Sequence, residues 1–343
     1  MSSRVVVRYP WEAPPDPATP TEVAPGIWWL RLPLPFVLDH VNVFVLEDGD
    51  GWTLIDCGLN KDSVRGIWER VADTLFGGRP VRRVIVTHFH PDHMGLCRWL
   101  IDRFGGELWM SETEWLWSQF AYESHERNME AMLAFWRTHG MATETIDAMR
   151  GRGNFYAQNV ARPPIVYRRI AEGDAIEIGG RVWHAIVGRG HAPEHICLAC
   201  SDDGLLLGGD QVLPRITTNI SVHYQEPLAD PLRLFMESTH KFGHLAPDTL
   251  TLCAHDRPFF GLHQRLVQLR EHHEERLEAA WEACATPKHA IDMLPVLFRR
   301  KLDLHQQSFA IGEALAHLHY LFHQGRLERV TGDDGVHRFI RAD

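Results

Sequence analysis

The chain has 343 residues, 45% of them hydrophobic, which is enough to bury a large core and predicts a folded globular protein. Its formal net charge of −10 argues against a general affinity for nucleic acid or anionic membranes, because both depend on clustered Lys and Arg. The sequence contains no signal-peptide pattern and no run of about 18 apolar residues, so we expect a cytoplasmic protein that acts on small molecules, without a membrane partner.

The first third of the chain alternates strand and helix patterns. Residues 1–25 include a stretch rich in Pro and Thr and are expected to be an irregular N-terminal segment. Three short runs of β-branched and aromatic residues follow, divided by turn residues, and they indicate an antiparallel start: 26–33, 41–48 and 51–58. The next segments predict a helix over 61–76, a buried strand over 81–87, a helix over 94–105 and a short strand over 107–110.

The pattern changes between about residues 111 and 160, where helices rich in Trp, Phe and Met predict an inserted cap. Strands resume over 174–188, 195–210 and 249–256, so we place the main domain at 26–262. A charged amphipathic helix over 263–285 is expected to connect it to the tail. The tail, 286–343, reads as helix, helix and hairpin, the order of a winged-helix-like domain.

Six cysteines are scattered along the chain, which favours reduced thiols over a disulfide framework. Cys197 and Cys200 form a C-x2-C pair, but they lie in a predicted strand. Residues three apart on a strand point to opposite faces, so we expect two buried structural thiols and not a shared metal site.

The stretch "VTHFHPDHMG" places four metal-binding side chains directly after a buried strand. They are His88, His90, Asp92 and His93. Imidazole nitrogen and carboxylate oxygen are ligands for zinc and related ions, and Pro91 ends the strand by fixing φ. One short loop supplies too few ligands for two ions, so further donors are required elsewhere.

Three later segments supply such donors. His191 opens "GHAPEH", Asp210 ends "LLLGGD" and His255 ends "LTLCAH". Each follows an apolar strand and is preceded by a small residue that allows the backbone to turn sharply. These side chains are therefore expected to meet at one edge of the sheets.

With "THFHPDH", "GHAPEH", "GGD" and "AHD" in this order, the sequence resembles the metallo-β-lactamase superfamily over roughly residues 25–262. The resemblance implies an α+β fold, a four-layered αββα sandwich, here with a helical cap and a C-terminal winged-helix-like domain. It also implies a first ion bound by His88, His90 and His191. It implies a second ion bound by Asp92, His93 and His255. Asp210 would bridge the two ions, and Asp56 in "LIDCG" would orient a ligand loop without contacting metal.

Two divalent ions would make this protein a hydrolase. Zinc is expected, with iron or manganese as alternatives that the same donors accept. A hydroxide bridging the ions would be the nucleophile. Asp92 would orient it and Asp210 would fix the separation of the ions, so both are candidate catalytic residues.

The substrate is expected to be a small acyl thioester or ester with an apolar part, because the aromatic cap would line an apolar pocket. Glyoxalase II-like thioesterases share all seven ligands. His223 and Tyr224, in the loop after Asp210, are candidate substrate contacts. Other histidines are expected to be ordinary polar residues, in particular His184, His195, His272 and His273.

Three alternatives remain open. A lactone hydrolase is one, although homoserine lactonases carry a tyrosine three residues beyond the bridging aspartate, where this chain has Leu213. A metal-dependent RNA endonuclease of the winged-helix branch is the second, but the expected recognition helix, 309–324, contains no Lys or Arg, and residues 288–343 carry eight basic against seven acidic side chains. A non-catalytic metal-binding protein is the third. We expect the tail to be a packing element or a homodimer contact.

Overall fold

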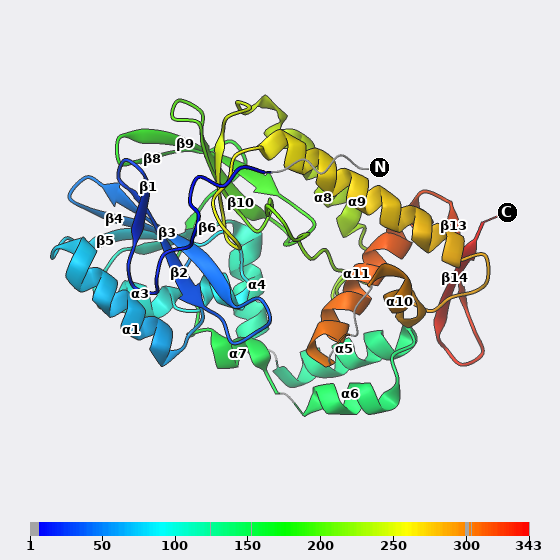
Figure 1. The fold of residues 1–343 in the computed structure, drawn as a ribbon. Helices are drawn as coiled ribbons and strands as arrows, with labels where there is room; N and C mark the ends of the chain where they lie inside the picture. The colour runs from blue at the N-terminus through cyan, green and yellow to red at the C-terminus, as the bar shows by residue number, and fades with distance from the viewer. Residues whose placement is uncertain (1–6, 124, 152, 299–301, 303, 343) are drawn as a thin grey trace.

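The computed structural model describes residues 7–123, 125–151, 153–298, 302 and 304–342. Two β-sheets face each other and helices cover their outer faces, which gives four layers in the order αββα (Figure 1). Three apolar clusters fill the spaces between these layers, one between the sheets and one under each helical layer. The layered sandwich confirms the predicted fold class.

The first sheet has seven strands in sequence order. They are β1 (Thr21–Ala24), β2 (Ile27–Pro33), β3 (His40–Asp48), β4 (Gly51–Ile55), β5 (Val81–Ile85), β6 (Glu107–Met110) and β7 (Arg168–Arg169). The first four pair antiparallel, which includes the three strands expected to do so, and the last three join in parallel. The stretch expected to be irregular to residue 25 is shorter than predicted, because β1 pairs with β2.

The second sheet has five strands in the order β12-β11-β10-β9-β8. They are β8 (Ala175–Ile178), β9 (Arg181–Gly188), β10 (His195–Cys200), β11 (Leu205–Gly209) and β12 (Leu250–Cys253). On β10, Cys197 packs under the outer helices and Cys200 packs between the sheets. The prediction that these two thiols point to opposite faces is therefore confirmed.

Helices cover both sheets. The first is covered by α1 (Asp62–Val71), which continues as a π-helical turn η1 (Ala72–Phe76), and by α3 (Cys97–Phe104). The second is covered by α8 (Pro231–His240), followed by a 3-10 turn η2 (Lys241–His244), and by α9 (Leu262–Ala283). Apolar spacing explains α1, because Val64, Ile67, Trp68 and Val71 all face the core.

The cap predicted between residues 111 and 160 is helical. It contains α4 (Glu112–Glu123), α5 (His125–Thr138), α6 (Thr143–Arg150) and α7 (Phe155–Asn159). Figure 1 shows α4 and α7 next to the first sheet, whereas α5 and α6 lie beside the C-terminal elements. Buried side chains of α5 and α6 share a core cluster with that tail. The insertion therefore contacts both the first sheet and the C-terminal tail.

The tail contains one long helix followed by a hairpin. Its elements are η3 (Ile291–Met293), α10 (Leu294–Leu297), α11 (Leu304–His323), β13 (Leu327–Thr331) and β14 (His337–Arg341). The first predicted tail helix is reduced to a 3-10 turn and one helical turn, and the winged-helix comparison stays a prediction. On α11 every side chain from Ala310 to His319 is buried. Among the described helices, none is both long and apolar enough to cross a membrane.

Candidate metal centre

Loops that leave β5, β9, β11 and β12 meet at one edge of the two sheets. The strand β5 ends at Ile85, and His88 and His90 follow on an extended loop. The short helix α2 (Pro91–Met94) then begins, so Asp92 and His93 lie on a helical turn. Proline at the first helical position fits this local structure, because its missing N–H would be unpaired there in any case.

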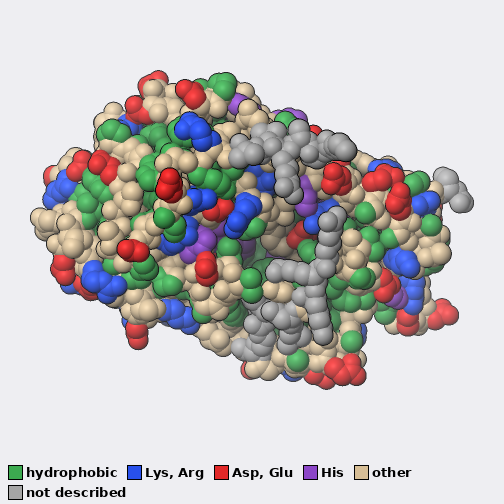
Figure 2. All heavy atoms as spheres, in the orientation of Figure 1, with side chains coloured by type: hydrophobic (Ala, Val, Ile, Leu, Met, Phe, Trp, Pro, Cys, Tyr) green, Lys and Arg blue, Asp and Glu red, His purple; other side chains and the backbone are tan. Residues whose placement is uncertain are grey.

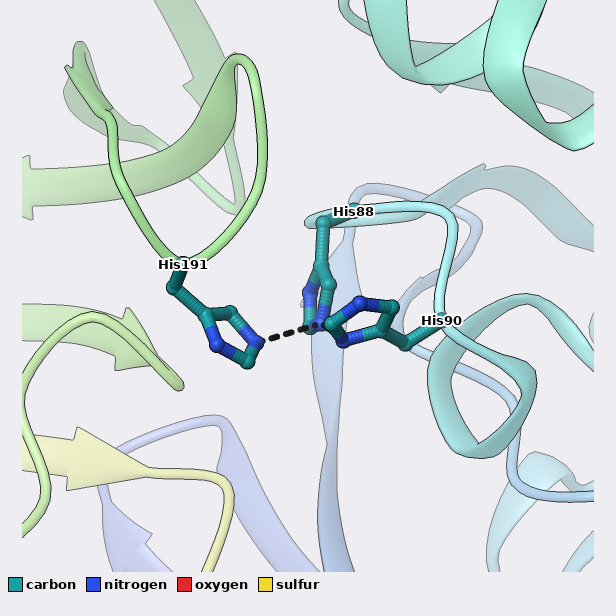
Figure 3. Close-up of side chains that lie close together, drawn as sticks. All are labelled: His88, His90 and His191. Atoms are coloured by element: carbon teal, nitrogen blue, oxygen red, sulfur yellow. Dashed lines mark hydrogen bonds between the residues drawn. The ribbon is translucent and has the colours of Figure 1, made fainter. Parts of the chain in front are cut away.

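The first group of donors contains three imidazoles. Figure 3 shows His88 and His90 on one loop, with His191 reaching them from a second loop. His88 Nε2 lies 2.9 Å from His90 Nδ1 and 3.2 Å from His191 Nε2. Two nitrogens bound to one tetrahedral zinc ion would be about 3.3 Å apart, given Zn–N distances of about 2.05 Å. The observed spacing is therefore close to that of a metal site.

The second group contains one carboxylate and two imidazoles. Asp92 Oδ2 lies 3.6 Å from His93 Nε2 and 3.7 Å from His255 Nε2. Donor atoms of all three residues lie within 4.8 Å of one another. His93 and His255 are buried, whereas Asp92 is partly open to solvent. This group can surround a second ion and leaves one side accessible.

Asp210 lies between the two groups. Its Oδ1 is 3.2 Å from His255 Nε2 and 3.7 Å from His93 Nε2, and its Oδ2 is 3.4 Å from His191 Nε2. Each carboxylate oxygen therefore faces a different group. Asp210 Oδ1 and His93 Nε2 are both buried, and neither makes a hydrogen bond within the described residues. Buried polar atoms almost always have partners, so this pair of atoms fits a site for cations.

The electrostatics of the centre also favour positive charge. Burial and the neighbouring imidazoles lower the pKa of His88 far below its usual value, so this ring is neutral and has a lone pair to donate. Burial opposes the charge on His93, but Asp56, Asp92 and Asp210 raise its pKa to about 10. Burial would raise the pKa of Asp210, but His255 and His93 lower it instead. A divalent cation would satisfy these carboxylates in place of protons.

Asp56 orients the second group without facing the donors' shared space. Its Oδ2 accepts a hydrogen bond from His93 Nδ1 at 2.8 Å, and its Oδ1 accepts one from the Thr87 backbone N–H at 2.8 Å. The Nδ1 proton stays with Asp56, so an ion that displaces the proton of Nε2 would bind the lone pair of that nitrogen. Asp56 therefore contacts both a predicted donor and the backbone of the loop that carries it.

Backbone carbonyls orient two more imidazoles in the same way. His255 Nδ1 donates to the His40 carbonyl at 2.8 Å, and His191 Nδ1 donates to the Asn219 carbonyl at 2.8 Å. In each ring the unprotonated Nε2 then faces the other donors. The structure thus brings all seven predicted donor side chains together and gives three of the histidines a partner that sets their tautomer.

His195 was expected to be an ordinary polar residue, but it lies against the centre. Its Nε2 accepts a hydrogen bond from the Asp210 backbone N–H at 3.1 Å, and its ring stacks on His88 with centroids 4.8 Å apart. A side chain at Gly209, where φ is +50°, would meet the His195 ring at 2.5 Å, which explains the second glycine of "GGD". Burial lowers the pKa of His195 to about 3, so it is a neutral acceptor that fixes the backbone of Asp210.

The two predicted substrate residues differ in their surroundings. His223 is exposed, with its ring 6.3 Å from that of Trp117, while desolvation and the nearby His191 lower its pKa to about 4. Figure 2 shows histidine side chains within a hollow of the face that it draws. Tyr224 is partly buried against the core shared with the tail.

Aromatic rings extend from the donors to the surface. Phe89, between His88 and His90, lies 5.5 Å from Trp117, and Trp117 lies 6.1 Å from the partly exposed Phe120. Other histidines lie elsewhere, as expected: His184 is exposed on β9, and His273 is buried on α9, beside His272 and 3.2 Å from His317. Aromatic rings of the ligand loop and of α4 thus lie in a row beside the first donor group.

Comparisons with known proteins agree with this geometry. Residues 37–275 match the family model of the metallo-beta-lactamase superfamily, and residues 277–342 match that of the metallo-beta-lactamase-like C-terminal domain. A probable metallo-hydrolase, YqjP of Bacillus subtilis (strain 168), is 26% identical over 85% of this chain and 91% of its own length.

Two solved structures are similar along nearly the whole chain. A beta-lactamase domain protein from Burkholderia ambifaria has a TM-score of 0.92 and 44% identity, covering 98% of each chain. A metallo-beta-lactamase family protein from Thermus thermophilus has a TM-score of 0.79 and 29% identity, covering 93% of this chain and 100% of its own. Both likenesses extend through the tail as well as the sandwich.

Proposed function

The chain belongs to the metallo-β-lactamase superfamily, and on this premise we propose that it is a hydrolase with two divalent metal ions, acting on a small acyl thioester or ester with an apolar acyl part. The single observation that carries the proposal is the position of Asp210, whose two oxygens face two separate groups of donors. A carboxylate shared in this way is suited to two ions, because a single ion would leave one donor group without a partner.

The proposed ligands follow from the two groups. His88, His90 and His191 would hold the first ion. Asp92, His93 and His255 would hold the second, and Asp210 would contact both. Imidazole and carboxylate donors favour zinc but also accept iron or manganese, so we name zinc as the first candidate. Two such ions, when bound, make hydroxide available near neutral pH and polarise a carbonyl oxygen.

The side chains themselves position the reactants. Asp92 is the more exposed of the two carboxylates, with 20% of its side-chain surface open against 10% for Asp210. We therefore assign Asp92 the second role of accepting a hydrogen bond from the attacking water, which orients it toward the substrate. Asp210, held by its backbone bond to His195, keeps the two donor groups at a fixed separation.

The aromatic wall supports an acyl substrate. Phe89 and Trp117 form adjacent rings beside His90, and the ring of His223 lies 6.3 Å from that of Trp117. An apolar acyl chain would gain about 0.8 kcal/mol for each methylene buried there. A thiolate leaves without an added proton more readily than an alkoxide, because the pKa of a thiol is about 8.5. We therefore rank thioesters first and oxygen esters second.

The structural details weigh against the alternatives. Against a lactone hydrolase, position 213 holds a leucine, which has no hydroxyl. Leu213 is buried, and its backbone carbonyl accepts a hydrogen bond from Arg265. The described part of α11 is buried from Ala310 to His319, which leaves that stretch no face for an RNA groove. The donor set has all seven members, which favours a catalytic centre over a purely structural one, because structural zinc sites are usually closed by four ligands.

The test is a substrate panel on metal-loaded protein. It compares thioesters, oxygen esters, lactones and single-stranded RNA, with the acyl chain varied in length. We expect hydrolysis of acyl thioesters, loss of metal in Asp210→Ala, and no turnover by that variant. Robust cleavage of RNA with no activity on any acyl substrate would overturn the assignment. An Asp210→Ala protein that retains two ions and full rate would overturn the metal mechanism.

A further inference from the structure

A buried carboxylate outside the donor set contacts two of the ligand loops. Glu114, on the first turn of α4, is completely inaccessible to solvent. Its Oε2 accepts a hydrogen bond from the backbone N–H of Phe89 at 3.0 Å, and its Oε1 accepts one from the backbone N–H of Glu194 at 2.7 Å. One side chain of the insertion thus connects a loop of the first sheet with a loop of the second.

The two acceptor bonds lie next to the first donor group. Phe89 stands between His88 and His90, and Glu194 follows His191 by three residues in the same turn. The distance between these two loops sets the distance between the imidazoles that Figure 3 shows. Because each oxygen of Glu114 serves one loop, the carboxylate fixes the position of one loop relative to the other.

Other contacts from the insertion fix the same two segments. The hydroxyl of Tyr156, on α7, donates to the Phe89 carbonyl at 2.7 Å, so both polar groups of Phe89 are bound by side chains of the insertion. The hydroxyl of Ser111 donates to the Glu194 carbonyl at 3.0 Å. The helices predicted as a substrate cap therefore also form part of the support of the metal centre.

Burying a carboxylate costs free energy, which a contact that only packs two loops together does not require. Burial raises the pKa of Glu114 to about 7, even though the two backbone N–H groups favour its charged form. A glutamine has only one oxygen and cannot accept from both N–H groups. The side chain present is thus the one that satisfies both loops at once.

We propose that Glu114 is a positioning residue for the first metal site, which sets the separation between His191 and the pair His88 and His90. This inference rests on the proposed metal centre and adds to it a residue that contacts neither metal nor substrate. Changes to residues that hold ligands in place typically lower metal affinity by about 10- to 100-fold. Glu114→Gln leaves one backbone N–H facing an amide N–H2, so one ligand loop loses its acceptor.

The test measures metal binding in three proteins: wild type, Glu114→Gln and Glu112→Gln. Glu112 lies on the same turn of α4, but its carboxylate pairs with Arg169 at the surface, 2.7 Å away, so its variant is a matched control. Affinity is measured for each ion by competition with a chelator, and the Co²⁺-substituted proteins are compared by their visible spectra. We expect the first ion to bind about 10- to 100-fold more weakly in Glu114→Gln, with an altered Co²⁺ spectrum, and no change in the control.

The metal-induced rise in Tm distinguishes a positioning role of Glu114 from a purely structural one. If Glu114 only stabilised the fold, its variant would melt lower with and without metal, and the rise would equal that of the wild type. A positioning role predicts a smaller rise. Should Glu114→Gln not fold, Glu114→Asp, which withdraws both oxygens by one methylene, is measured in the same way.

Different results would refute the metal centre and the role of Glu114. Wild-type protein that binds no metal would refute the metal centre itself. Wild-type protein that binds two ions, together with Glu114 variants of unchanged affinity, spectrum and Tm rise, would refute only the role of Glu114.

Discussion

Replacing Asp56 by asparagine tests how the second metal site depends on one proton. In the native arrangement, Asp56 Oδ2 accepts from His93 Nδ1 and Asp56 Oδ1 accepts from the Thr87 backbone N–H. An asparagine has one acceptor and one donor. If its oxygen continues to accept from Thr87, its N–H2 group faces His93 Nδ1 and forces the proton of that ring onto Nε2.

The consequence differs between the metal-free and metal-bound protein. A proton on His93 Nε2 faces Asp92 Oδ2 at 3.6 Å and Asp210 Oδ1 at 3.7 Å, so the metal-free protein tolerates the new tautomer. The same proton blocks the lone pair that an ion requires. We therefore expect a loss of about 10- to 100-fold in affinity for the second ion, which corresponds to about 1.4 to 2.7 kcal/mol.

Metal affinity and metal-free stability are measured on the same samples. Asp48→Asn is the matched control, because Asp48 is also a buried carboxylate that accepts from a threonine hydroxyl, Thr53 Oγ1 at 2.8 Å, but it lies at the far end of β3. We expect Asp48→Asn to lower stability without changing metal affinity and Asp56→Asn to lower metal affinity. Two ions bound with native affinity in Asp56→Asn would refute the tautomer argument.

Three further predictions concern regions around the centre. Burial lowers the pKa of His139 and of His319 to about 4, against about 6.5 in the unfolded chain. The free energy of unfolding of the metal-free protein should therefore fall as the pH drops from 6.5 toward 4, by about 1.4 kcal/mol per pH unit for each histidine. Urea unfolding at pH 7 and at pH 5 measures this change, and equal stabilities would contradict it. Glu313, on α11, accepts a hydrogen bond from Asn219 Nδ2 at 3.2 Å, and the Asn219 carbonyl orients His191. Glu313→Ala should loosen this segment and lower the affinity for the first ion by up to about 10-fold. Glu313→Gln keeps an acceptor oxygen and should leave that affinity unchanged. Trp117→Ala should flatten the dependence of kcat/KM on acyl length by about 0.8 kcal/mol per methylene with two ions still bound, and an unchanged dependence would place the acyl chain elsewhere.

That the seven predicted donor side chains come together could be predicted, because their positions follow from local rules. A polar residue that ends an apolar strand must lie at the edge of the sheet, and four such strand ends carry the seven donors. The helical insertion was also predictable from the sequence pattern, whereas the four layers were implied by the resemblance to the metallo-β-lactamase superfamily. In contrast, β1 was missed, because "TEVA" is too short to show a pattern beside a stretch rich in Pro and Thr.

The residues that support the donors were not predictable in the same way. Glu114 and Tyr156 lie on helices that showed only aromatic packing, and their contacts with Phe89 depend on how the insertion folds back onto the sheet. His195 supports Asp210 across two neighbouring strands, and no local pattern separates it from a core histidine. Such contacts join segments far apart in the sequence, so they require the tertiary structure.

Anomalous diffraction from crystals of the metal-loaded protein locates the bound ions. We expect two peaks, one on each side of the Asp210 carboxylate. One would lie about 2.0 to 2.2 Å from nitrogens of His88, His90 and His191, and the other at similar distances from His93, His255 and Asp92. A single peak that leaves one donor group empty at saturating metal, or peaks away from Asp210, would contradict the proposed metal centre.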